Sequence, residues 1–237
     1  TSIASNWKGK VVDEDAFLLA LPADVAPGSE PPGAALILGG SGTQRIEAMA
    51  SYRGGVVAVG SFTGVLEVLI DADVVSFASA GGRDAFVLFA DMGTTVWDEN
   101  GLGWQAGAGI RSVRVISGPG DQIASGVAVN DPGHIVVAGS FEETATLEPL
   151  APIVSAGGSD VFVLGLMTSA LTPRQLLGGG SAGTQRPTGI AISDAGTAVI
   201  VGEMENTLNR GDELLDAASI TTTQPLAGFV VALDMRP

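Results

Sequence analysis

The strongest constraint on this chain is a set of short blocks that recur in the same order along its 237 residues. One block is a phenylalanine that opens an apolar run, and it recurs about every 70 residues. Its four copies contain Phe17, Phe86, Phe162 and Phe229. Such self-similarity predicts a fold built from copies of one small structural unit.

Three further blocks accompany the phenylalanine block. They are an apolar run that ends in glycine, a Gly-x-Gln segment ahead of a short strand, and a Ser-Ala-Gly-Gly sequence. Their copies contain or span Gly60, Gly139 and Gly202; residues 42–45, 120–123 and 183–186; and residues 79–82 and 155–158. Four blocks in a fixed order argue against chance similarity.

The blocks have the composition of β-strands. They are rich in Val, Ile and Phe, and Gly, Asp, Asn or Pro bound them, as in Asp131-Pro132-Gly133. No long 3.6-residue periodicity competes with them. Each unit is therefore predicted to form a meander of four antiparallel strands.

The predicted strands divide unevenly along the chain. Residues before Ile46 supply only the last two strands of a sheet, at 16–21 and 35–39, and the C-terminal unit supplies three. The expected sequence is two, four, four and three strands. Short extended pieces at 153–155 and 218–221 are expected in the loops before the phenylalanine strands.

A single sheet of this size cannot bury its apolar faces by itself. Copies that stack radially around an axis cover one another's faces. The predicted fold is therefore all-β, with about three to four β-propeller blades in residues 1–237, as one domain or a propeller fragment. The repeat units span residues 15–83, 84–159 and 160–237. A parallel β-helix has a shorter repeat, and a two-sheet sandwich leaves the repeat unexplained. Two hypotheses stay open for the missing strands: a longer propeller, or a second chain that completes the ring.

Residues 127–141, which contain Asn130-Asp131-Pro132-Gly133, together with residues 157–163, resemble the bacterial SBBP family of β-propeller repeats. The resemblance covers most of residues 15–235. It implies blades of a propeller and an extracellular or cell-surface location, and it implies no activity. The sequence departs from the pattern in a long insert at 94–109 and in the loss of Ser-Ala-Gly-Gly before Phe229.

Composition narrows the partners and the metal chemistry. With 11 basic and 26 acidic residues, the formal charge of −15 argues against nucleic acid and anionic membranes as partners. No apolar stretch approaches the roughly 20 residues that cross a bilayer. The chain has no cysteine and one histidine, His134, which is expected at a strand start. Thiolate chemistry, cysteine-bound zinc and a histidine-rich metal site are therefore excluded within the chain.

The sequence contains no catalytic signature, because a Ser-His-Asp triad, a nucleophile elbow, a P-loop and a zinc-protease motif are all missing. Carboxylate clusters are present, and such groups can serve glycoside hydrolysis or bind Ca²⁺. They lie at residues 13–15, 71 and 73, 142 and 143, and 212 and 213. The repeated Asp15, Asp84 and Asp160 are expected to bind turn amides instead, because an active site is needed only once. No cofactor is predicted, with Ca²⁺ as the alternative.

Trp97 and Trp104 stand out because both fall in the long insert, where binding residues tend to gather. They are the candidate ligand-binding residues, for sugar stacking or protein contact; no catalytic or metal site is assigned. The first hypothesis is a non-catalytic extracellular interaction or scaffold module that binds a protein or a glycan. The alternatives are a carbohydrate-active hydrolase or lyase with carboxylates on blade loops, and a structural subunit of a larger assembly.

Overall fold

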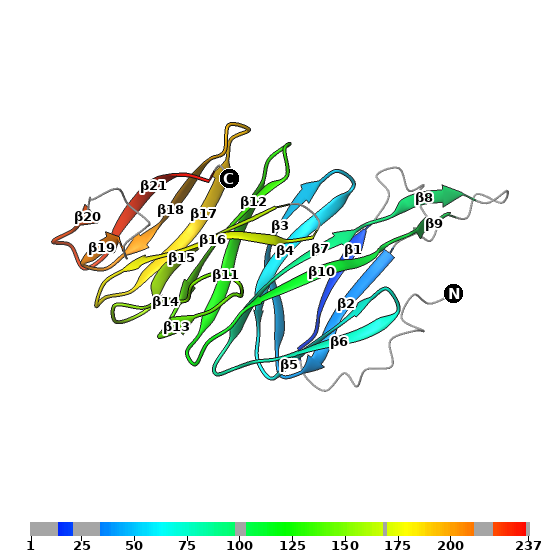
Figure 1. The fold of residues 1–237 in the computed structure, drawn as a ribbon, viewed down its shortest axis with the longest axis horizontal. Helices are drawn as coiled ribbons and strands as arrows, with labels where there is room; N and C mark the ends of the chain where they lie inside the picture. Colours follow the sequence, from blue (N-terminus) through cyan, green and yellow to red (C-terminus); the bar gives the residue numbers. More distant parts are fainter. Residues whose placement is uncertain (1–13, 21–33, 98–102, 168–169, 211–219, 236–237) are drawn as a thin grey trace.

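The computed structural model describes residues 14–20, 34–97, 103–167, 170–210 and 220–235 (Figure 1). These residues form strands and turns and contain no helix, which confirms the all-β prediction. None of them belongs to a helix that could span a membrane.

The main strands form four antiparallel groups. The N-terminal pair consists of β1 (Ala16–Ala20) and β2 (Ala34–Ser41). Sheet 1 consists of β3 (Gln44–Tyr52), β4 (Gly55–Phe62), β7 (Asp84–Asp91) and β10 (Gly109–Ile116). Sheet 2 consists of β11 (Gln122–Val129), β12 (His134–Phe141), β15 (Asp160–Met167) and β16 (Thr172–Gly180). Sheet 3 consists of β17 (Gln185–Ile192), β18 (Thr197–Met204) and β21 (Ala227–Asp234). The strands predicted for these meanders are present and pair as antiparallel neighbours.

Shorter strands lie between the second and third strand of each sheet. They are β5 (Val65–Ile70) and β6 (Asp73–Ala78) in sheet 1, β13 (Thr144–Ala145) and β14 (Ile153–Val154) in sheet 2, and β19 (Thr207–Arg210) and β20 (Ile220–Thr221) in sheet 3. The sequence predicted only single extended pieces at 153–155 and 218–221. Each piece instead pairs with a partner strand to form a small ribbon.

These ribbons join each sheet to the group before it. Strand β5 pairs with β2 at Gly39–Ser41, and β19 pairs with β16 at Gly179 and Gly180. In sheet 2 the same link is an isolated bridge between Ser117 and Thr146. A single parallel bridge from β5 to β10 also joins the N-terminal pair and sheet 1 into one eight-stranded sheet. Neighbouring groups are therefore held by backbone hydrogen bonds as well as by packing.

The groups stack face to face, and Figure 1 shows them side by side along the long axis of the molecule. Three clusters of buried apolar side chains fill the layers between neighbours: one between the N-terminal pair and sheet 1, one between sheets 1 and 2, and one between sheets 2 and 3. The inner sheets are covered on both sides, so nearly every residue of β7 and β15 is buried. Stacking is what buries the apolar faces, as the repeat predicted.

Sheet 3 is covered on one side only among the described residues. Along β18 and β21 buried and exposed residues alternate, which is the pattern of a strand with one open face. The residues Val199, Val201 and Val230 are 37%, 39% and 66% exposed. Their equivalents in sheet 2, by position relative to the repeated glycine and phenylalanine, are the buried Val136, Ala138 and Val163.

Candidate functional site

One feature of the fold occurs in sheet 1 and not in sheet 2. The connection between the third and fourth strands of sheet 2 takes only the four residues 168–171, whereas in sheet 1 it spans residues 92–108. It contains a second ribbon, β8 (Thr94–Trp97) paired with β9 (Gly103–Ala106). Figure 1 shows this hairpin projecting from the stack. The predicted long insert is thus a hairpin.

Glycines mark both ends of the β8–β9 hairpin. Gly93 precedes β8 with a φ of 73°, and Gly107 follows β9 with a φ of 78°. Side-chain-bearing residues rarely adopt such angles, so glycine is the residue that lets the chain leave sheet 1 and return to it here. The two turns separate the β8–β9 pairing from the β7–β10 pairing of the sheet.

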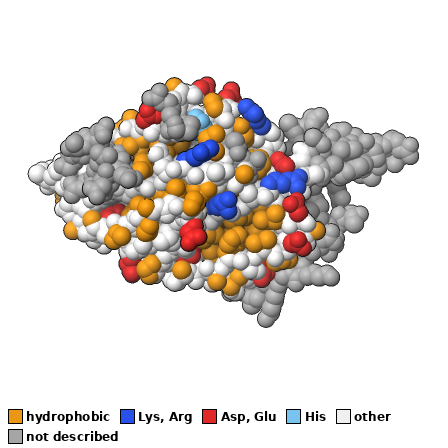
Figure 2. Space-filling view, viewed as in Figure 1, with side chains coloured by type: hydrophobic (Ala, Val, Ile, Leu, Met, Phe, Trp, Pro, Cys, Tyr) orange, Lys and Arg blue, Asp and Glu red, His pale blue; other side chains and the backbone are white. Residues whose placement is uncertain are grey.

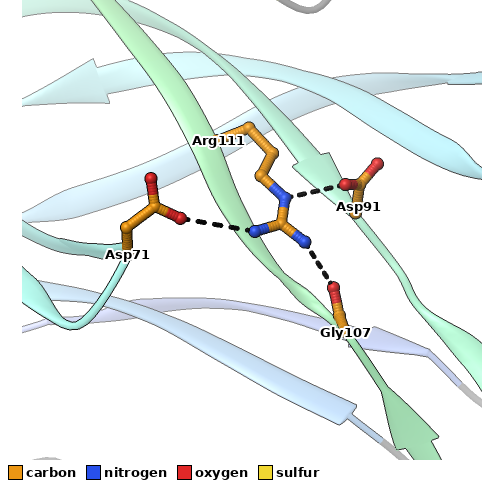
Figure 3. A network of polar contacts seen from close by, with 4 residues as sticks. All are labelled: Asp71, Asp91, Gly107 and Arg111. Atoms are coloured by element: carbon orange, nitrogen blue, oxygen red, sulfur yellow. Dashed lines mark hydrogen bonds and ion pairs between the residues drawn. The ribbon is translucent and has the colours of Figure 1, made fainter.

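A single arginine binds the base of the hairpin to the sheet. Arg111 donates from Nε to Asp91 Oδ2 at 2.7 Å and from Nη2 to the Gly107 carbonyl oxygen at 2.7 Å, while Nη1 lies 3.4 Å from Asp71 Oδ1 (Figure 3). These partners come from the end of β7, the residue after β9 and the β5–β6 turn. The planar guanidinium thus fixes three segments relative to one another.

The network is held by charge at the surface. The hydrogen bond from Arg111 to Asp91, and the negative charges of Asp91 and Asp71, raise the pKa of Arg111 further above its ordinary value. All three side chains are partly or largely exposed, so the ion pairs contribute little to global stability. Their effect is local: they hold Gly107, and with it the return of the hairpin, against β10.

The two candidate tryptophans lie on this hairpin. Trp97 is the last residue of β8 and pairs with Gly103, while Trp104 of β9 pairs with Val96. The backbone register therefore brings the two residues to neighbouring positions of one ribbon, but not directly opposite each other. Arg111, which lies two residues beyond the insert at 94–109, was not among the predicted site residues.

Two of the three repeated aspartates, Asp84 and Asp160, bind turn amides, as predicted. Asp84 accepts hydrogen bonds from the amides of Ala80 and Gly118, at 3.1 Å and 3.5 Å. Asp160 accepts them from Ala156 and Ser181, at 2.6 Å and 3.1 Å. Burial raises the pKa of both carboxyls above the ordinary value, and the amide hydrogen bonds oppose this. Each aspartate ties the Ser-Ala-Gly-Gly turn to the loop that enters the next sheet.

The described members of the other predicted carboxylate clusters do not come together as one site. Asp71 and Asp73 border the β5–β6 turn, Glu142 and Glu143 follow β12, and residues 13, 212 and 213 lie outside the described residues. Within the described part of the chain, no three acidic or histidine side chains are close enough together to hold a metal ion. His134 begins β12, as expected.

No protein-family model matches the chain, and no curated protein matches it. The resemblance to SBBP repeats therefore stays a prediction that rests on the quoted residues.

Proposed function

We propose that this chain is a non-catalytic interaction module, extracellular or at a cell surface, that binds a protein or glycan partner through the β8–β9 hairpin. The observation that carries the proposal is that, among the described residues, the hairpin occurs in sheet 1 only, whereas sheet 2 joins the same two strands with four residues. The glycine–phenylalanine pairs and the aspartate turns recur from sheet to sheet, and each has a packing or hydrogen-bonding role. An insertion with no equivalent in the next sheet has no such role in the stack.

The composition and anchoring of the hairpin support a binding role. Trp97 and Trp104 supply large amphipathic side chains of the kind that dominate protein interfaces and stack on sugar rings. The Arg111 network fixes the base of the hairpin, so less conformational entropy is lost when a partner is bound. On the face of the molecule drawn in Figure 2, basic side chains are few, in keeping with the net charge of −15.

The test compares the wild-type chain with the double variant Trp97→Ala/Trp104→Ala. Both are applied to an array of immobilised oligosaccharides and to a library of displayed proteins of known sequence. Loss of a wild-type ligand in the double variant, with an unchanged melting temperature, is expected. A ligand bound equally by both chains, or the absence of any ligand in either set, contradicts the proposal.

A further inference from the structure

Among the described residues, the N-terminal pair has no counterparts of the two strands that begin sheets 1 and 2. By its repeat position β1 is a third strand, because Phe17 corresponds to Phe86 of β7 and Phe162 of β15. Strands β7 and β15 pair with a second strand on one side and a fourth strand on the other. Among the described residues β1 pairs only with β2, which is the fourth-strand side. No described strand pairs with the side of β1 at which β7 and β15 meet a second strand, and this side is called the open edge.

A groove of about 440 Å³ runs beside this open edge. All of β1 except its first residue lines one wall, and the opposite wall is formed by parts of β3 and β4 and by Met92. The residues that contribute apolar side chains to the second wall are Ile46, Ala48, Met49, Val56 and Met92; Glu47 is the charged residue among the lining. The groove therefore lies where sheets 1 and 2 have their first and second strands.

The face of β1 that is turned away from sheet 1 is apolar and exposed. Phe17 is 65% exposed and Leu19 is 50% exposed. At the same repeat positions Phe86 and Leu88 are buried against the N-terminal pair, and Phe162 and Leu164 are buried against sheet 1, whereas no described group covers this face of β1. An exposed apolar strand with a free edge is a site at which another strand can add.

In sheets 1, 2 and 3 the residue paired with the repeated phenylalanine is always a glycine. Each one lies directly opposite a glycine of the second strand, in the pairs Gly60–Phe86, Gly139–Phe162 and Gly202–Phe229. A Cβ atom on any of the three glycines would collide with the ring of the paired phenylalanine. By analogy with these three pairs, a strand that completes β1 is expected to place glycine opposite Phe17.

The same comparison specifies the rest of the added strand. In β4 and β12 the residues one and three positions before the glycine are Val59 and Val57, and Ala138 and Val136, and all four are buried against the next sheet. In a strand added to β1, residues at these positions would face the apolar wall of the groove.

We propose that the groove beside β1 binds an extended segment of another polypeptide as an antiparallel second strand, with a glycine opposite Phe17 and small or β-branched residues at the two alternate positions before it. Backbone hydrogen bonds to the open edge supply affinity, and the glycine requirement supplies specificity. The segment has the chemistry of the second strand of a repeat of this kind. This inference uses different residues from the hairpin and does not depend on the proposed function.

The probe is a fluorescein-labelled peptide with the sequence of β12, His-Ile-Val-Val-Ala-Gly-Ser-Phe, followed by two lysines for solubility. Its binding to the whole chain is measured by fluorescence anisotropy. The control peptide has valine in place of the glycine. We expect saturable binding of the glycine peptide and about tenfold weaker binding of the valine peptide, because the valine side chain meets the Phe17 ring.

Three protein variants locate the site, and each changes an exposed residue so that the fold is retained. Phe17→Ala is expected to weaken the glycine peptide and to remove the difference between the two peptides, since the collision needs the ring. Met49→Glu places a charge in the groove and is expected to weaken binding about tenfold or more. Val230→Glu, at the similarly exposed position of sheet 3, is expected to leave binding unchanged.

Several results would overturn the inference. They are no saturable binding of the glycine peptide, equal binding of both peptides to the wild-type chain, and unchanged discrimination in Phe17→Ala. An effect of Val230→Glu equal to that of Met49→Glu would also overturn it, because the peptide would then not be bound at β1.

Discussion

In sheet 2, Gly139 of β12 lies directly opposite Phe162 of β15, and the phenylalanine ring fills the space that a side chain at Gly139 would need. The carbonyl oxygen of Ile123 closes the other side of this space. Two of the repeated sequence blocks are therefore one structural contact, made once in each of sheets 1, 2 and 3. Phe162 is fully buried in the layer between sheets 1 and 2, so the contact also sets the distance to the neighbouring sheet.

Replacing Gly139 by alanine is expected to destabilise the protein by about 1–3 kcal/mol, because the added methyl group forces the Phe162 ring or the backbone of β11 to move. Urea unfolding followed by circular dichroism measures the change. Gly109→Ala is the control, since the nearest atom to its added Cβ would be 3.8 Å away on the Arg111 side chain. A loss in the control equal to that in Gly139→Ala would contradict the packing explanation.

Val163 and Val230 hold equivalent positions in sheets 2 and 3 but differ in exposure, at 0% and 66%. Val163→Ala is expected to cost roughly 2 kcal/mol, from the lost burial of two methyl groups and the cavity that remains. Val230→Ala is expected to change the free energy of unfolding by less than about 0.5 kcal/mol. Equal losses in the two variants would show that the outer face of sheet 3 is covered in solution.

Removing the guanidinium of Arg111 is expected to free the base of the β8–β9 hairpin. In Arg111→Ala the free energy of unfolding should change by less than about 1 kcal/mol, because the ion pairs are exposed. Limited proteolysis should nevertheless cut residues 94–106 several times faster than in the wild-type chain. Arg45→Ala, which removes an exposed ion pair with Glu14, is the control and should leave the cleavage rate unchanged. Equal cleavage of wild type and Arg111→Ala would argue against the anchoring role.

Asp160 is expected to make stability fall as pH rises. Burial raises its pKa in the folded protein above the ordinary value of 3.8, so the folded state binds the proton more tightly than the unfolded state. The contribution of the protonated carboxyl is complete below pH 3.8 and is lost as the pH rises through the folded-state pKa. Asp160→Asn removes this titration at that position.

The measurement is the free energy of unfolding of both chains from pH 3 to pH 7. The free energy of unfolding of the wild type, minus that of Asp160→Asn, should decrease as the pH rises through this window. A difference that grows in favour of the wild type with rising pH would mean that the hydrogen bonds from Ala156 and Ser181 outweigh burial.

Much of the fold could be predicted from local sequence. The phenylalanine and glycine blocks mark the third and second strands because their residues must fit a pleated sheet covered on both sides. The turn at Asp131–Gly133 was predicted from its residue types, because glycine readily adopts positive φ. In the structure Gly133 has a φ of 92°. Asp84 and Asp160 were correctly assigned to turn amides because a repeated residue points to a repeated structural need.

The links between sheets could not be predicted in the same way. The pairing of β5 with β2 and of β19 with β16 depends on backbone groups far apart in sequence. The periodicity of side chains along one strand does not indicate which distant strand its backbone will pair with. The insert at 94–109 was predicted only as a departure from the repeat, and its pairing as a hairpin was not predicted. Gly93 and Gly107 are the turns at the two ends of this hairpin. Arg111 gave no signal, since its partners come from three separate segments.

The face-to-face stacking of repeated sheets is tested most directly by comparing amide hydrogen exchange in β12 and β18. Both are second strands with a paired strand on each side, so their hydrogen bonding is alike, and they differ in having two covered faces or one. If stacking holds the sheets, amides of β12 should exchange more slowly than those of β18 by roughly a factor of ten or more. Equal exchange in the two strands, or slower exchange in β18, would contradict it.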